Sequence, residues 1–101
     1  METTENKQVE LTSTQETIKK VCASIYNTLI EKNKRYGNSA IQPAGVFSKI
    51  SADQAILVRL DDKLKRVQNS EELRKNDIFD LIGYLTLLAV SKEWTFEDMI
   101  D

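Results

Sequence analysis

The sequence predicts an all-α protein, a small bundle of three main helices with short additional helices. Three stretches repeat apolar residues with the period of an α-helix, and no stretch shows the paired alternation of a β-hairpin. A chain of 101 residues has room for one domain with only a modest core. We therefore expect self-association, as a dimer or a tetramer, to complete that core.

The first helix is expected over residues 14–33. Ser13 and Glu16 have the spacing of a capping box, in which a hydroxyl and a carboxylate satisfy free backbone N–H groups. Residues 1–12 are polar and predict a disordered tail, so the folded domain is expected to span 13–101. The helix carries a stripe of apolar residues predicted to face the core, including the lone cysteine: Ile18, Val21, Cys22, Ile25 and Leu29.

The segment between residues 33 and 51 contains two of the three glycines and the only proline. We expect a loop with a short helix near residues 46–50 that packs Phe47 and Ile50 into the core. A connection of this length is uncommon in a compact domain and often serves as a binding loop. Tyr36 and its neighbours therefore remain candidates for ligand contact.

Two further helices follow this loop. The second is expected to begin with a capping motif at Ser51 and to end near Asn69, and its core stripe is Ile56, Leu57, Leu60, Leu64 and Val67. The third is expected to have Asn76 as its N-cap and is apolar on almost every side from residue 78 to 90, which is typical of a central buried helix. A short last turn is expected at residues 95–98.

The composition excludes several kinds of chemistry. Without His and with one Cys, the chain lacks the residues of Ser-His-Asp and Cys-His catalysis and of most zinc sites. Its 14 Lys and Arg against 16 Asp and Glu leave no basic surface typical of nucleic-acid binding. The 78–90 segment is too short to span a membrane, and the single Cys with a polar N-terminus predicts a cytoplasmic protein.

Asp77 and Asp80 carry the strongest chemical signal in the sequence. They lie one turn apart on the most apolar helix and share a face with Tyr84. An ionised carboxylate in such surroundings needs a metal ion or a cationic partner. With Asp62 from the second helix, these acids would form an oxygen-rich site suited to Mg²⁺ or Mn²⁺.

A structural role is the alternative explanation for the same two carboxylates. Asp77 would cap its helix, and Asp80 would pair with a cation from the second helix. The candidates for that partner are Arg59, Lys63 and Arg66.

The segment 31–39 combines a helix end, three cations, an aromatic ring and a glycine turn. Cations near a helix C-terminus are ordinary partners of the helix dipole. A binding role would place Lys32, Lys34 or Arg35 against phosphate and Tyr36 against a base or a ribose.

Three motifs together resemble a known family. They are KN-x-x-YG-x-S at residues 32–39, R-x-x-DK at 59–63 and D-x-x-DL-x-x-Y at 77–84. Over residues 20–91, their order and character resemble the nucleotide modification associated family of bacteriophages, which is related to the MazG-like all-α NTP pyrophosphatases. The resemblance implies a MazG-like helical oligomer that acts in a host cytoplasm.

The resemblance also implies a reaction, the Mg²⁺-dependent cleavage of the α–β phosphoanhydride of a (deoxy)nucleoside triphosphate. In that superfamily, an E-x-x-E pair on one helix and an E-x-x-D pair on the next bind the metal. Asp77 and Asp80 match the second pair, with Asp in place of Glu. In the first pair Asp62 keeps one acid, whereas Arg59 stands where the other is expected.

The implied catalytic acids and metal ligands are thus Asp62, Asp77 and Asp80, and Glu31, Asp61 or oxygens of the substrate would complete the metal shell. The implied nucleotide contacts are Lys32, Asn33, Tyr36, Arg59, Lys63, Arg66 and Tyr84. Because one acid of the usual four is missing, the alternative is a non-catalytic phage protein that binds a nucleotide, for instance as a sponge for a host signal. A helical module that binds a partner protein is a third possibility.

Overall fold

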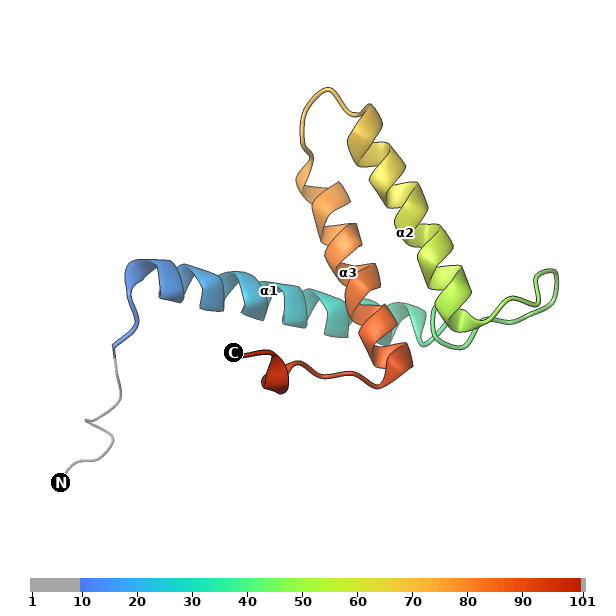
Figure 1. The fold of residues 1–101 in the computed structure, drawn as a ribbon, viewed down its shortest axis with the longest axis horizontal. Coiled ribbons are helices and arrows are strands. Elements are labelled where there is room, and N and C mark those ends of the chain that lie inside the picture. Colours follow the sequence, from blue (N-terminus) through green and yellow to red (C-terminus); the bar gives the residue numbers. More distant parts are fainter. Residues whose placement is uncertain (1–9, 101) are drawn as a thin grey trace.

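The computed structural model describes residues 10–100 and consists of three α-helices followed by one turn of 3₁₀-helix (Figure 1). The elements are α1 (Ser13–Tyr36), α2 (Ala52–Asn69), α3 (Lys75–Lys92) and η2 (Glu97–Met99). The described residues contain no strand, which confirms the predicted all-α class. Of the predicted tail, residues 1–9 lie outside the described residues.

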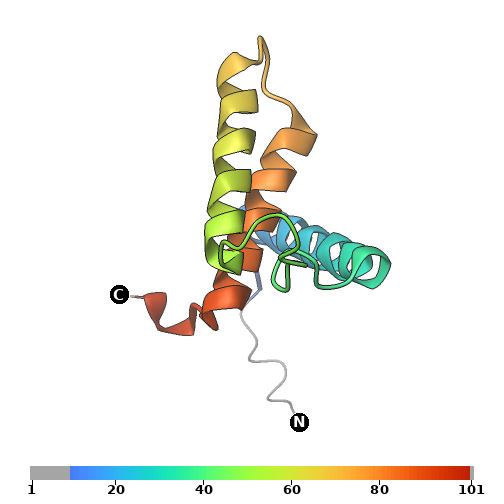
Figure 2. The same ribbon diagram turned by 90° about the vertical axis from the view of Figure 1, so that its right-hand side faces the viewer.

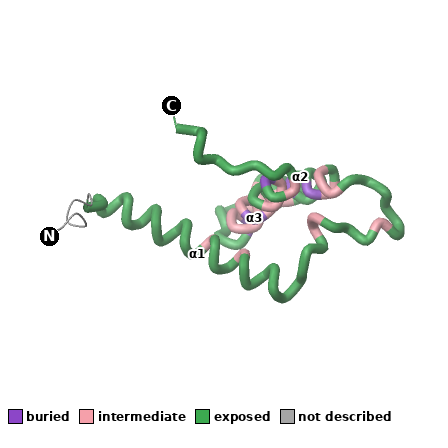
Figure 3. Tube along the Cα trace, turned by 90° about the horizontal axis from the view of Figure 1, so that it is seen from below, coloured by how far each residue is buried: buried purple, intermediate pink, exposed green. Residues whose placement is uncertain are grey.

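α2 and α3 form an antiparallel helical hairpin that contains the small core (Figure 1). Ile56 and Leu60 from α2 and Ala89 from α3 are the buried apolar side chains among the described residues, and the buried positions cluster between these two helices (Figure 3). Asp53 connects the first turn of α2 to the last turn of α3. Its carboxylate accepts a hydrogen bond from the Ser91 hydroxyl and lies near Lys92.

α1 crosses α3 and, within residues 10–100, contacts no other helix. The view in Figure 2 shows α2 and α3 side by side, with α1 extending from the lower part of the hairpin on the α3 side. The crossing is close because α3 has a glycine there: a Cβ atom at Gly83 would lie 3.3 Å from Cδ2 of Leu29. The N-terminal half of α1 extends beyond the hairpin, and no residue of α1 is buried (Figure 1).

The start of α1 corrects one sequence prediction. Thr12, and not Ser13, is the N-cap: its hydroxyl accepts from the N–H of Gln15, and the Gln15 side chain accepts from the N–H of Thr12. The capping box is thus shifted by one residue relative to the Ser13–Glu16 prediction. At the other end the helix runs to Tyr36, three residues past the predicted end.

Of the other two helices, α2 begins at the predicted N-cap and α3 does not. Ser51 caps α2 as predicted, because its hydroxyl accepts from the N–H of Gln54. The N-cap of α3 is Arg74, without a side-chain cap, so the prediction of Asn76 was wrong.

None of the described helices has both the length and the apolar character needed to span a membrane.

The segment between α1 and α2 differs from its prediction. No helix forms at residues 46–50, and Phe47 is fully exposed while Ile50 is 49% exposed. The chain bends there after Gly45, which has a φ of 68°. Phe47 and Ile50 therefore do not pack into the core; they line a shallow hollow beside α2 instead.

Several predicted core residues are also exposed in a single chain. Ile18 and Val21 are 57% and 50% exposed, and Cys22 is exposed, so their assignment to the core of one chain was wrong. On α2, Leu57 and Leu64 are likewise 44% and 55% exposed. The predicted helical period is correct, but within the described residues of one chain nothing packs against these apolar faces.

Candidate functional site

A pocket of about 400 Å³ lies between the C-terminal turns of α1, the turn that follows, and α3. Its lining is mainly apolar and aromatic, with a few polar groups: Leu29, Lys32, Asn33, Tyr36, Gly37, Asn38, Ser39, Ala40, Ile41, Phe79, Asp80, Gly83, Tyr84 and Leu87. On α3 these residues follow an i, i+4 spacing, which places them on the face toward α1. The pocket therefore joins two segments that are far apart in the sequence.

Asn33 shapes the turn that closes one side of the pocket. Its Nδ2 atom donates hydrogen bonds to the carbonyl oxygen of Gly37 at 3.2 Å and to Oδ1 of Asn38 at 2.9 Å. The N–H of Gly37 in turn donates to the carbonyl of Asn33 at 2.7 Å. Gly37 has a φ of 67°, a backbone conformation that glycine adopts without a steric cost. The Asn and Gly of the first motif thus have a structural role in positioning Tyr36.

The pocket contains one cation from α1. The Nζ atom of Lys32 lies 5.8 Å from the centre of the Phe79 ring, which is within the range of a cation–π contact. This contact holds the lysine side chain over the wall formed by α3. A positive charge therefore lies beside aromatic surface on one side of the pocket.

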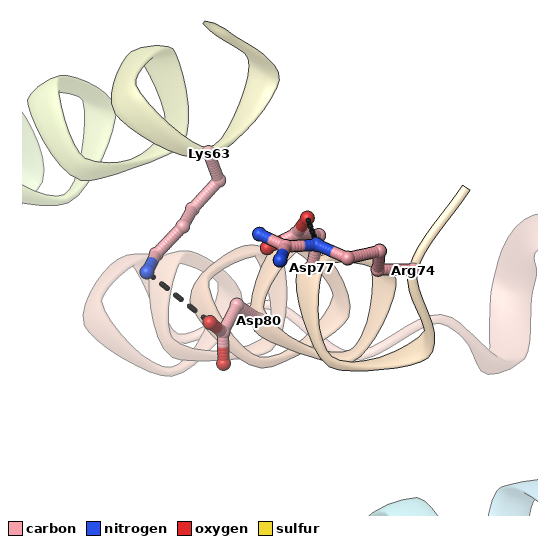
Figure 4. Close-up of polar contacts among 4 residues, drawn as sticks. All are labelled: Lys63, Arg74, Asp77 and Asp80. Carbon is pink, nitrogen blue, oxygen red and sulfur yellow. Dashed lines mark hydrogen bonds and ion pairs between the residues drawn. The ribbon is translucent and has the colours of Figure 1, made fainter. Parts of the chain in front are cut away.

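The carboxylate in the pocket has a cationic partner. Oδ2 of Asp80 lies 3.1 Å from Nζ of Lys63 on α2, and the side chains are 30% and 16% exposed, respectively (Figure 4). Of the three cations offered by the sequence as partners of Asp80, the structure selects Lys63. The charge of Asp80 is thus largely balanced before any ligand binds.

Asp77 lies apart from the pocket and is 1% exposed. Its Oδ2 atom lies 3.1 Å from Nε of Arg74, whereas Oδ1 has no hydrogen-bond partner (Figure 4). A buried carboxylate oxygen without a partner is costly, so Asp77 depends on this one arginine. Asp77 and Asp80 are consequently drawn toward two different cations.

The predicted metal ligands do not converge in one chain. Asp62 is exposed on α2, and Glu31 pairs with Arg35 at 3.6 Å on the surface of α1. Across residues 10–100, no three Asp, Glu, Cys or His side chains are placed to share a metal ion. Asp77 and Asp80 each pair with a cation instead, Arg74 and Lys63, respectively.

The predicted nucleotide contacts divide into two groups. Four of them line the pocket: Lys32, Asn33, Tyr36 and Tyr84. Lys63 reaches the pocket through Asp80, while Arg66 is exposed on α2 and Arg59 lines a second hollow beside the 43–50 loop.

Several pocket residues were not predicted from the sequence as ligand contacts, among them Leu29, Phe79 and Leu87. Phe79 and Leu87 were read only as part of an apolar helix, and Leu29 as part of the core stripe. The i, i+4 relation of Phe79 and Leu87 to Gly83 was the available signal, because a small residue between large ones permits a close helix crossing.

No family model matches the chain, and no curated protein or solved structure matches it.

Proposed function

We propose that the protein binds a nucleotide in the pocket between α1 and α3. The observation that supports this most directly is the convergence of Lys32, Tyr36 and Tyr84 with Asp80 around one hollow. Its volume of about 400 Å³ lies within the ~300–1,000 Å³ range of small-molecule sites. An apolar lining with a few polar groups is also typical of such sites.

The side chains of the pocket match the parts of a nucleotide. The rings of Tyr36, Phe79 and Tyr84 offer flat surfaces on which a base stacks. Lys32 supplies a compact positive charge for a phosphate. Asp80 keeps Oδ1 as an acceptor for an amino group of the base or a hydroxyl of the sugar, since its Oδ2 is bound by Lys63.

The test is a calorimetric titration with a panel of NTPs, dNTPs and cyclic nucleotides. We expect Tyr36→Leu and Lys32→Gln each to weaken binding of the preferred nucleotide by about 5- to 150-fold, since each removes an interaction worth about 1–3 kcal/mol. Tyr26→Leu and Lys34→Gln are matched controls on the same helix, because neither residue lines the pocket. Equal losses in the controls, or no binding of any nucleotide, would contradict the proposal.

Hydrolysis of the bound nucleotide is the second candidate function. The observation in its favour is Oδ1 of Asp77, a buried acidic oxygen without a partner on the helix that also carries Asp80. A Mg²⁺-dependent pyrophosphohydrolase needs further acids beside them, and in this proposal a second chain supplies them. Incubation of the nucleotide panel with Mg²⁺ or Mn²⁺, followed by detection of pyrophosphate and monophosphate, distinguishes an enzyme from a binding protein.

Self-association is part of the proposed function in either case. From the sequence we expect the chains to associate through α2 and α3. On these helices Val58 and Leu85 are 52% and 54% exposed. Such exposure of large apolar side chains is typical of a surface that another chain covers. Analytical ultracentrifugation over micromolar concentrations, with and without nucleotide, tests this part of the proposal.

A further inference from the structure

The N-terminal half of α1 and the two residues before it present an uncovered apolar surface, which we name the α1 arm and define as residues 11–22. Leu11, Ile18 and Val21 are 44%, 57% and 50% exposed. Ile18 and Val21 lie on the same stripe that, two turns later, places Leu29 against Gly83 of α3. The α1 arm therefore continues an existing packing surface beyond the edge of α3.

The chain after α3 presents a second uncovered apolar surface, the C-terminal segment (residues 93–100). Glu93 ends α3 in the left-handed conformation and redirects the chain. Four large apolar residues then follow, all more than half exposed: Trp94, Phe96, Met99 and Ile100. Within the described residues, η2 contacts none of the three helices.

The two surfaces lie on the same side of the hairpin but do not meet. In Figure 1 both extend away from α3 in the same direction, and Figure 3 shows them separated. Their net charges are opposite, because Lys19 and Lys20 outweigh Glu16 in the α1 arm, whereas the C-terminal segment carries only acids, Glu93, Glu97 and Asp98. All of these charged residues are exposed.

From this complementarity we propose that two copies of the chain form a two-fold dimer in which the α1 arm of each packs against the C-terminal segment of the other. A two-fold interface requires that each chain supply both halves of the contact, and this chain does so. The arrangement covers both apolar surfaces at once. Lys19 and Lys20 then face the acids of the C-terminal segment at the rim.

The exposed area is sufficient for such a dimer. A standard protein interface buries ~800 Å² on each partner. The seven large apolar residues of the two surfaces, at 44% exposure or more, together offer an area on the order of that value. Neither surface contributes to the pocket lining, so this inference goes beyond the proposed nucleotide site and does not depend on it.

A charge-exchange experiment tests the contact in the full-length chain. We expect sedimentation of the wild type to give twice the mass of one chain. Lys19→Glu/Lys20→Glu and Glu97→Lys/Asp98→Lys should each weaken the dimer at least about 10-fold, since like charges then face each other. Combining the four substitutions restores opposite charges and should restore the dimer.

Matched controls separate this contact from general charge effects. Lys34→Glu/Lys49→Glu changes the net charge as much as the α1 arm variant does, at exposed positions outside both surfaces and outside α2 and α3, and should leave the dimer intact. Circular dichroism reports whether each variant remains helical. A dimer that neither charge reversal weakens, or one that the fourfold variant fails to restore, would overturn the proposal.

Packing within one chain is the competing arrangement, and the lone Cys22 allows a direct test of it. Met99→Cys adds a second thiol in the C-terminal segment. Under oxidation we expect a disulfide between chains, detected as a covalent dimer that links tagged to untagged protein when the two are mixed. A monomeric product in which Cys22 is bonded to the introduced thiol of its own chain, or a wild type that sediments as one chain, would overturn the proposal.

Discussion

Nζ of Lys63 lies 3.1 Å from Oδ2 of Asp80 and joins the middle of α2 to the wall of the pocket. The two side chains come from different helices and are mostly shielded from water. The pair therefore stabilises the hairpin and at the same time holds a carboxylate at the wall of the pocket. This arrangement agrees with the structural alternative for Asp80 that the sequence left open.

Asp80→Asn should destabilise the metal-free protein, because it leaves the Lys63 ammonium without its anionic partner. We expect the free energy of unfolding to fall by about 1–3 kcal/mol, between the values for exposed and fully buried pairs. Urea denaturation measures the change, and Asp80→Asn/Lys63→Met should recover part of it. A higher melting temperature for Asp80→Asn alone would show that Asp80 is held at an energetic cost, as expected of a metal ligand.

Arg74→Ala should destabilise the protein although Arg74 itself is 56% exposed. The substitution leaves both oxygens of the buried Asp77 without a partner, and we expect a loss of about 1–3 kcal/mol in the free energy of unfolding. Arg66→Ala, at an exposed position of α2, is the control and should change stability by less than about 0.5 kcal/mol. Equal effects of the two substitutions would mean that Arg74 does not support Asp77.

The pH dependence of stability should contain a contribution from Asp53. The hydrogen bond from Ser91, followed by the ammonium group of Lys92, lowers the pKa of Asp53 below its ordinary value. A lowered folded-state pKa contributes stability that is present above about pH 4 and is lost as the pH falls through the folded-state pKa. Asp53→Asn should therefore melt below the wild type at neutral pH, and the difference should close in acid.

Asp61→Asn is the matched control for this pH effect, because Asp61 is exposed on the same helix. Thermal melts followed by circular dichroism from about pH 3 to about pH 7, a range that spans the ordinary titration of an Asp carboxyl, provide the measurement. A gap between wild type and Asp53→Asn that stays constant over this range would rule out the contribution of the Asp53 carboxylate.

Gly83→Leu should separate α1 from α3 and remove the pocket. A Cβ atom alone would already lie 3.3 Å from Leu29, so the larger side chain has no room. We expect a loss of about 1–3 kcal/mol in stability and a loss of nucleotide binding. Adding Leu29→Ala creates space and should recover part of both; unchanged binding in Gly83→Leu would place the ligand elsewhere.

Local patterns in the sequence were enough to predict the helices and their apolar faces. The apolar period depends on local geometry, and it correctly marked three helices and the α2 residues Ile56 and Leu60 as a core. The cap at Ser51 was equally readable, because a side chain and a backbone group three residues apart interact within one turn. Thr12 was missed because Thr12 and Ser13 are both good caps and only one register forms.

Which apolar faces contact each other depends on how the helices pack in three dimensions. A helical stripe shows that a face is apolar but not what covers it, so Leu29 contacts α3 while Ile18 on the same stripe is exposed. Likewise, charge pattern allowed three partners for Asp80, and the packing of α2 against α3 selected Lys63. Contacts between distant residues depend on where helices cross, and that position is set by the small side chain of Gly83 and by packing along the whole hairpin, which no local pattern encodes.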